Sequence, residues 1–204
     1  MISLSQNSYC IDGSVEIFKI VTGVVMDETF WKNLKEKPGF DWFIEARRYL
    51  QSAEVLRASP EYQQGLITTP PLHLLAHGSE LLLKANLIAS GCSAAEVRSF
   101  GHDLWKLWNN DKNASIRFNI LTAAHEEWEA ASSEPAWQGN FGDDSAIIFQ
   151  EYFECLSALH SNKTDFALRY VRSEETHAPK PHLLSSTMFR VADQYVRAMI
   201  YAHE

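Results

Sequence analysis

The sequence has few of the residues that interrupt regular secondary structure. Nine of its 204 residues are glycine and seven are proline. Because these two residues are the strongest breakers of helices, their scarcity favours long helical elements. The length suits one domain with a full hydrophobic core, or one such domain with a small addition.

Positive charge and cysteine are scarce as well. The chain has 18 lysine and arginine residues against 26 aspartate and glutamate residues, which gives a formal net charge of −8. This balance opposes extended contact with phosphate backbones or with anionic membrane surfaces. The three cysteines are far apart and lack metal or redox spacing, so we expect thiols in a reducing cytoplasm. They are Cys10, Cys92 and Cys155.

Segments that insert into membranes are also missing from the sequence. No apolar stretch reaches the length that spans a bilayer, and the N-terminus lacks the charged and apolar parts of a signal peptide. We therefore expect a cytoplasmic protein that does not associate with membranes.

Apolar residues recur at helical spacing through most of the chain. Five substantial helices are expected, over approximately residues 40–58, 69–90, 115–128, 144–159 and 182–200. The second is apolar around most of its circumference, which predicts a central position. Because helices with one apolar face bury it against other helices, we predict an all-α fold, an up-and-down bundle of four or five helices.

Residues 1–38 have a different pattern from the rest. Residues 7–21 place β-branched and aromatic residues on both sides of Asp12-Gly13, a dipeptide typical of a tight β-hairpin turn. Asp27 can cap a short helix that runs to Leu34. We predict that residues 1–38 form a small N-terminal appendage, with a β-hairpin, and that residues 39–204 form the helical bundle.

A row of polar residues interrupts the leucine-rich second helix. His73, His77, Glu80 and Lys84 are four, three and four positions apart, so they lie on one line of a helix. The row is interpreted as the exposed edge of a core helix with a solvated Glu80–Lys84 pair, as a metal site, or as a line facing a ligand or partner. No glutamate lies between the histidines as in a zinc protease, and no second acidic motif completes a di-iron site. We therefore expect neither a metal nor a cofactor.

Three short motifs together resemble a known family. The helix reads L-L-x-H-x-x-E-L-x-L-K-A-x-L, and after Gly91 the chain continues to G-H-D-L-x-x-L at residues 101–107 and to Leu168-Arg169-Tyr170. The combination resembles the HEPN family, helical domains of higher eukaryotes and prokaryotes named for nucleotide binding. The similarity spans roughly residues 40 to 203. Asp103 in the second motif is also suited to cap a helix.

The resemblance implies a bundle that pairs as a homodimer and, in many members, a metal-independent endoribonuclease of toxin or defence type. The signature of such enzymes is an arginine followed four to six residues later by a histidine, in the dimer cleft. Histidine supplies an acid or base near neutral pH, and arginine supplies a fixed cation. Arg172 and His177 match, and so do Arg197 and His203 at the chain end.

Both matches depart from an active signature. The segment from Arg172 to His177 contains two glutamates, which repel phosphate, and Pro179 follows it. We therefore predict a dimeric module that binds RNA, a nucleotide or an antitoxin-like protein without robust catalysis. The alternative is an endoribonuclease with Arg172 and His177 as catalytic residues. Binding residues are predicted to be Arg169, Tyr170, His77 and Glu80.

A third hypothesis is a structural adaptor that enters into no chemistry. The loop SSEPAWQGNFGDD carries Trp137 and Phe141 between polar and glycine residues. An exposed aromatic pair of this kind can anchor a protein interface, or both rings can fold back on the bundle.

Overall fold

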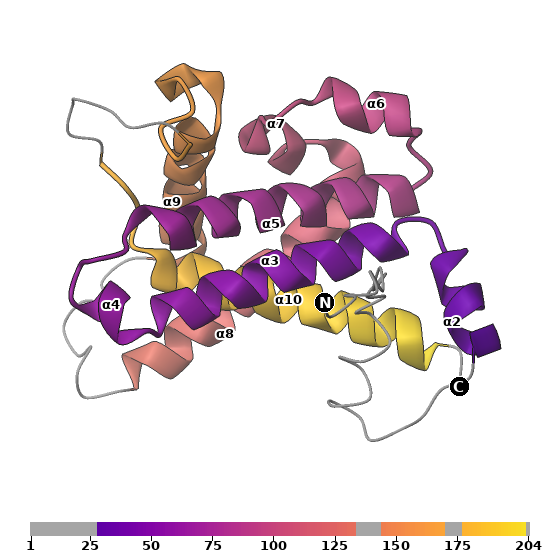
Figure 1. Ribbon diagram of the computed structural model, residues 1–204, viewed down its shortest axis with the longest axis horizontal. Helices are drawn as coiled ribbons and strands as arrows, with labels where there is room; N and C mark the ends of the chain where they lie inside the picture. The colour runs from indigo at the N-terminus through magenta and orange to yellow at the C-terminus, as the bar shows by residue number, and fades with distance from the viewer. Residues whose placement is uncertain (1–27, 134–143, 170–176, 203–204) are drawn as a thin grey trace, which may run out of the picture.

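A computed structural model describes residues 28–133, 144–169 and 177–202 of the chain (Figure 1). These residues form helices joined by turns, and no strand occurs among them. The all-α class is therefore confirmed for the described part of the chain. The predicted hairpin at Asp12-Gly13 and the loop residues Trp137 and Phe141 lie outside the described residues.

Five long helices lie where the apolar periodicity predicts them. They are α3 (Phe40–Arg57), α5 (Thr69–Ala89), α8 (Ala114–Ser132), α9 (Ser145–His160) and α10 (Pro181–Tyr201). Shorter elements connect them: α2 (Glu28–Lys35), α4 (Pro60–Gln63), α6 (Ala94–Ser99), α7 (Leu104–Trp108) and the 3-10 turns η1 (Asp111–Asn113) and η3 (Asn162–Thr164). None of the described helices is both long and apolar enough to cross a bilayer.

The helix ends follow local chemistry. Asp144 caps α9, since its Oδ1 accepts a hydrogen bond from the backbone N–H of Ala146 at 2.8 Å. Two prolines occupy the first turn of α5, where their missing N–H groups cost nothing. Helix α5 begins at Thr69, and Thr68 precedes it without a side-chain cap bond.

The leucine-rich helix α5 is central, as its composition predicts. Figure 1 shows α3 and α5 running side by side in opposite directions, α10 alongside α3, and α9 crossing at a steep angle. Leu75, Leu82 and Leu83 of α5 are fully buried in one core shared by all the long helices. Side chains packed around the whole circumference of α5 explain why its apolar residues do not keep to one face.

Helix α2 contributes to the same core. Leu34 is fully buried and Trp31 is nearly so. Lys37, just after the helix, donates a hydrogen bond to the carbonyl of Met199 near the end of α10 at 3.1 Å. The short helix expected to run to Leu34 is confirmed, whereas the division into domains at residue 38 remains a prediction.

Helices α3 and α5 pack tightly against each other at Gly78 of α5. A Cβ atom on Gly78 would lie 2.7 Å from Cγ of Leu50 and 3.0 Å from its Cδ2. Both distances are shorter than carbon atoms tolerate without movement, so the absence of a side chain at Gly78 sets the spacing of the two helices.

We expect Gly78→Ala to destabilise the protein. The crowding against Leu50 costs about 1–3 kcal/mol, which exceeds the gain of about 1 kcal/mol from better helix propensity. Urea denaturation should show a net loss of about 1 kcal/mol in the free energy of unfolding. In a Leu50→Ala background the two clashing side-chain atoms are gone and only the contact with the backbone nitrogen of residue 50, at 3.1 Å, remains, so Gly78→Ala should cost less there. Equal costs in both backgrounds would contradict this packing argument.

Candidate functional site

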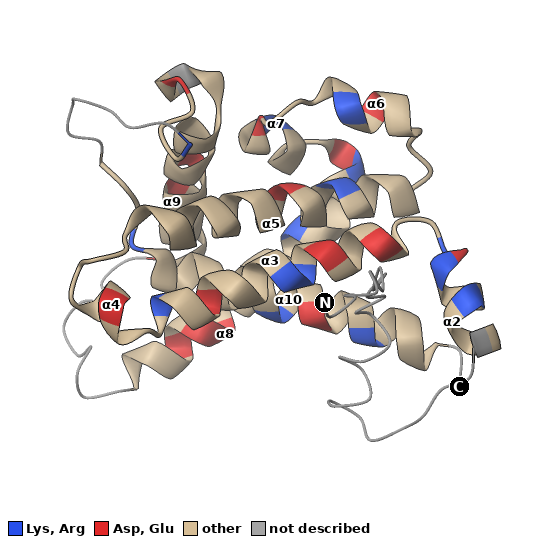
Figure 2. Ribbon diagram, in the orientation of Figure 1, with Lys and Arg blue, Asp and Glu red and all other residues tan. Residues whose placement is uncertain are grey.

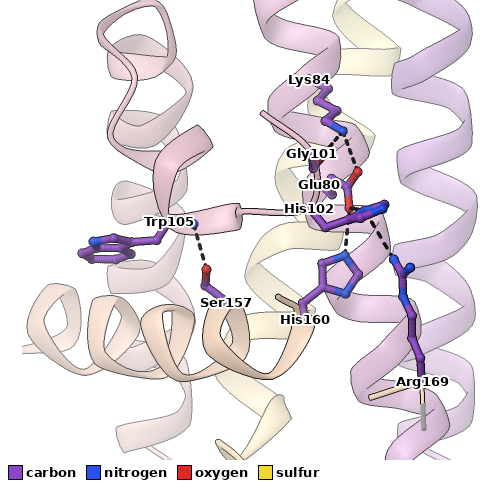
Figure 3. A network of polar contacts seen from close by, with 8 residues as sticks. All are labelled: Glu80, Lys84, Gly101, His102, Trp105, Ser157, His160 and Arg169. Atoms are coloured by element: carbon purple, nitrogen blue, oxygen red, sulfur yellow. Dashed lines mark hydrogen bonds and ion pairs between the residues drawn. The ribbon is translucent and has the colours of Figure 1, made fainter. Parts of the chain in front are cut away.

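A buried carboxylate on α5 is the centre of a polar network (Figure 3). The Glu80 residue is only 3% exposed. Its Oε1 accepts a hydrogen bond from Lys84 Nζ at 2.6 Å, while its Oε2 lies 2.8 Å from His160 Nε2 and 3.0 Å from His102 Nδ1. Three groups from three parts of the chain therefore meet on one carboxylate.

Lys84 ties the GHDL segment to the central helix. Its ammonium group also donates to the carbonyl of Gly101 at 2.7 Å, and the lysine is buried. Gly101 has φ +58, a left-handed conformation that glycine adopts without strain, and its carbonyl lies next to the ammonium group. The prediction that Asp103 caps a helix is confirmed, because its Oδ1 accepts from the N–H of Lys106 in α7 at 3.0 Å.

A further bond connects the GHDL segment to α9. The backbone N–H of Trp105 donates to Oγ of Ser157, which is buried, at 2.9 Å. His160 lies one turn further along α9, so the same helix holds both the segment and the carboxylate. Figure 3 shows the two contacts on the same side of α9.

The interpretation of the polar row as a solvated helix edge is wrong for Glu80 and Lys84. Both residues are buried, because α9 and the segment around Gly101 cover this part of α5. His77, one turn before Glu80, and His73, two turns before it, are half-buried, and burial lowers the pKa of both imidazoles. Helical spacing places the four residues on one line but does not tell which neighbours cover that line.

The hydrogen bonds keep Glu80 ionised despite its burial. Burial alone raises the pKa of a carboxyl group, but hydrogen bonds from His160, Lys84 and His102 outweigh it and hold the pKa of Glu80 well below its usual range. An ionised carboxylate only accepts hydrogen bonds. It follows that Nε2 of His160 and Nδ1 of His102 both carry protons and donate to Glu80.

Arg169 lies at the outer end of the network. Its Nη2 is 3.3 Å from Nδ1 of His102. Because this nitrogen donates its proton to Glu80, it cannot also accept one from the guanidinium group. Arg169 and His102 are therefore close but not hydrogen-bonded to each other. The N–H donors of Arg169 that face His102 remain available to a hydrogen-bond acceptor.

An aromatic ring completes the exposed side of the site. The guanidinium carbon of Arg169 lies 5.3 Å from the ring centroid of Phe166, whose ring is 6.1 Å from that of His102. The side chain of His102 is 42% exposed and Arg169 is exposed. The surface of the network thus presents an imidazole, a guanidinium group and an aromatic ring together.

An unusual turn after α9 positions Phe166 and Arg169. Asp165 and Phe166 have φ values of +48 and +55, which non-glycine residues adopt at a cost of about 1–3 kcal/mol each. The N–H of Phe166 donates to the carbonyl of Ser161 at 3.0 Å, and the hydroxyl of Thr164 donates to that of Ala158 at 2.8 Å. These bonds hold the turn against the end of α9.

The predicted site residues fall into three groups. Glu80 and Arg169 belong to the network, and His77 lies beside it, with its ring 4.5 Å from that of Tyr49. His177 is exposed, and its carbonyl oxygen lies 3.7 Å from Sγ of Cys155. Tyr170 and Arg172 lie outside the described residues, so the pairing of Arg172 with His177 stays a prediction.

Sequence reasoning missed His160. It lies at the end of α9, which was recognised only by its apolar face, and it has no neighbour in the sequence that suggests a site. Its side chain is fully buried in the structure, and buried polar groups need partners, but that burial is not visible in the sequence. Nothing in the sequence indicates that the partner is Glu80.

The chain has no match among protein-family models, curated proteins or solved structures. Its resemblance to the HEPN family therefore depends on the residues of the three motifs. What the site does has to be argued from its geometry and charge.

We expect Glu80→Gln to destabilise the protein strongly near pH 7. Breaking a buried ion pair costs about 3–5 kcal/mol because the partner charge stays buried. The pKa of Glu80 is lower in the folded chain than in the unfolded chain. The contribution of ionised Glu80 to the free energy of unfolding is therefore fully present above pH about 4.5, the pKa of this group in the unfolded chain. It decreases as the pH falls further. Urea denaturation at a series of pH values measures both effects.

The control is Glu151→Gln, which removes a carboxylate from an exposed position of α9. We expect it to change the free energy of unfolding by less than about 0.5 kcal/mol. A Glu80→Gln variant as stable as this control at pH 7 would show that the network does not stabilise the fold.

Proposed function

We propose that this chain is a HEPN-like helical domain that binds a phosphate-bearing ligand, a nucleotide or the end of an RNA, through Arg169 and His102. The network supports the proposal because it joins all three motifs that carry the resemblance. Glu80 and Lys84 come from the first motif, Gly101 and His102 from the second, and Arg169 from the third. The first two motifs meet at the carboxylate of Glu80, and the third lies beside His102.

The chemistry of the exposed side suits a phosphate group next to a base. A guanidinium group matches phosphate geometry and keeps its charge at all physiological pH values. The ring of Phe166 offers a surface on which a base can stack. The buried carboxylate orients His102 through Nδ1, so that Nε2 is the nitrogen left for the ligand.

The charge distribution favours a small ligand over a long nucleic acid. Basic and acidic residues are interleaved along the same helices (Figure 2), and the net charge is −8. Affinity for a nucleic-acid backbone grows with the number of phosphates that are neutralised. On a surface where acidic and basic residues are interleaved, a longer nucleic acid therefore gains little affinity over a short one. A ligand that needs one cation and one imidazole fits this surface better.

The proposal does not include efficient cleavage. The groups of the network are engaged in holding one another, and the pair Arg172 and His177 remains the predicted basis of the alternative, an endoribonuclease. Pairing of two chains is a further prediction from the resemblance. An antitoxin-like protein partner is predicted on the same basis.

Calorimetric titration with ATP and with a short 5′-phosphorylated single-stranded RNA tests the proposal. We expect both ligands to bind the full chain and Arg169→Gln to weaken binding about 10- to 100-fold, since a charge-assisted hydrogen bond contributes about 1.5–3 kcal/mol. The matched control is Arg98→Gln, an exposed arginine of α6 outside the network, which should leave the affinity unchanged.

The outcomes are distinct. Absence of binding by the unmodified chain, or equal loss in both variants, would contradict the proposed function. Cleavage of the RNA that disappears in both Arg172→Ala and His177→Ala would favour the endoribonuclease instead.

A further inference from the structure

A second set of polar atoms surrounds Glu80, apart from its contacts with Lys84 and His102. One ring nitrogen of His77, one of His160 and one carboxylate oxygen of Glu80 all lie within 4.8 Å of one another. Glu80 and His160 are buried and His77 is half-buried. Two imidazoles and a carboxylate from two helices are a ligand set that binds zinc with three protein ligands.

Two nearby imidazole nitrogens have no hydrogen-bond partner in the part of the chain that the structure describes. They are the buried Nδ1 atoms of His160 and His73, whose rings are 6.2 Å apart. The side chain of His160 is fully buried, so water does not reach that nitrogen from the surface. A buried polar atom without a partner costs about 1–3 kcal/mol, so the described residues do not fully satisfy these two imidazoles.

One ring nitrogen of His160 lies directly against a carboxylate oxygen. Nε2 of His160 donates its proton to Oε2 of Glu80 at 2.8 Å, and Nδ1 has no hydrogen-bond partner among the described residues. A metal ion bound by Nε2 and Oε2 takes the place of that proton, and the neutral imidazole then carries its proton on Nδ1, because a ligand nitrogen must be deprotonated. Lys84 occupies Oε1, so Oε2, which also accepts from His102, is the oxygen that binds the ion.

We propose that His77, Glu80 and His160 form a binding site for a divalent transition-metal ion, zinc above all. Two nitrogen ligands select zinc over magnesium and calcium, which prefer oxygen. Donor atoms within 4.8 Å come around one ion, with bonds of about 2.0–2.1 Å, after small side-chain rotations. Three protein ligands leave the fourth position for water or another ligand.

The site differs from the metal interpretation of the polar row. That interpretation used His73, His77 and Glu80, which all lie on α5. The structure adds His160 from α9, which lies far along the sequence. The expectation that the chain binds no metal was based on the sequence motifs of zinc proteases and di-iron bundles, and those motifs do not reveal a single histidine from another helix.

Titration of the full chain with zinc, in competition with a chromophoric chelator, tests the site. We expect one zinc ion per chain, and a loss of at least tenfold in affinity in His77→Ala. His77 is the ligand to substitute because it takes no part in the hydrogen bonds of Glu80, so the network stays intact. The control is His125→Ala, whose side chain on α8 is 61% exposed and contacts Glu129, and which should bind zinc as tightly as the unmodified chain.

Two further measurements make the result decisive. Cobalt in place of zinc should give the strong visible absorption of a four-coordinate site in the unmodified chain and not in His77→Ala. Zinc should also raise the melting temperature of the unmodified chain and not that of His77→Ala, since a ligand stabilises the state that binds it.

The absence of one-to-one binding at micromolar protein, or equal affinity in His77→Ala and the unmodified chain, would overturn the proposal. Because the titration contains no nucleotide, it does not depend on the proposed function. Arg169→Gln should keep the zinc affinity unchanged, so the metal site and the phosphate site can fail separately.

Discussion

The burial of an ionised carboxylate in the middle of a leucine-rich helix is the constraint on which the rest of this structure depends. Glu80 would be too costly to bury alone, and the cost is met by Lys84, His160 and His102. Because these donors lie on α5, on α9 and before α7, the helices are held in one relative arrangement. A single charge thus connects α5, α9 and the segment before α7.

The carboxylate of Glu80 contacts an exposed group of side chains on one side and a buried histidine on the other. Toward the surface it orients His102, and beside that imidazole lie the guanidinium group of Arg169 and the ring of Phe166. Toward the interior it accepts a hydrogen bond from His160, whose other ring nitrogen has no partner among the described residues. A proposed phosphate site and a proposed metal site therefore share Glu80 as a common support, although each uses ligands that the other does not.

Local features of this protein were largely predictable, whereas contacts between distant residues were not. The five long helices, the cap at Asp144 and the cap at Asp103 follow from spacing and side-chain chemistry over a few residues. The burial of Lys84 and the contact of Glu80 with His160 depend on which helix covers which face. The left-handed turn at Phe166 has no glycine to signal it, and it is held by bonds to the end of α9.

The sequence by itself determined the helical class, the central place of the leucine-rich helix and the identity of Glu80, Lys84 and Arg169 as residues of interest. These depend on periodicity and local chemistry, which are written along the chain. Only the tertiary structure decided that Glu80 is buried and that His160 completes its surroundings. The physical reason is that desolvation and pairing depend on the packing of α9 against α5, and no spacing within either helix encodes that contact.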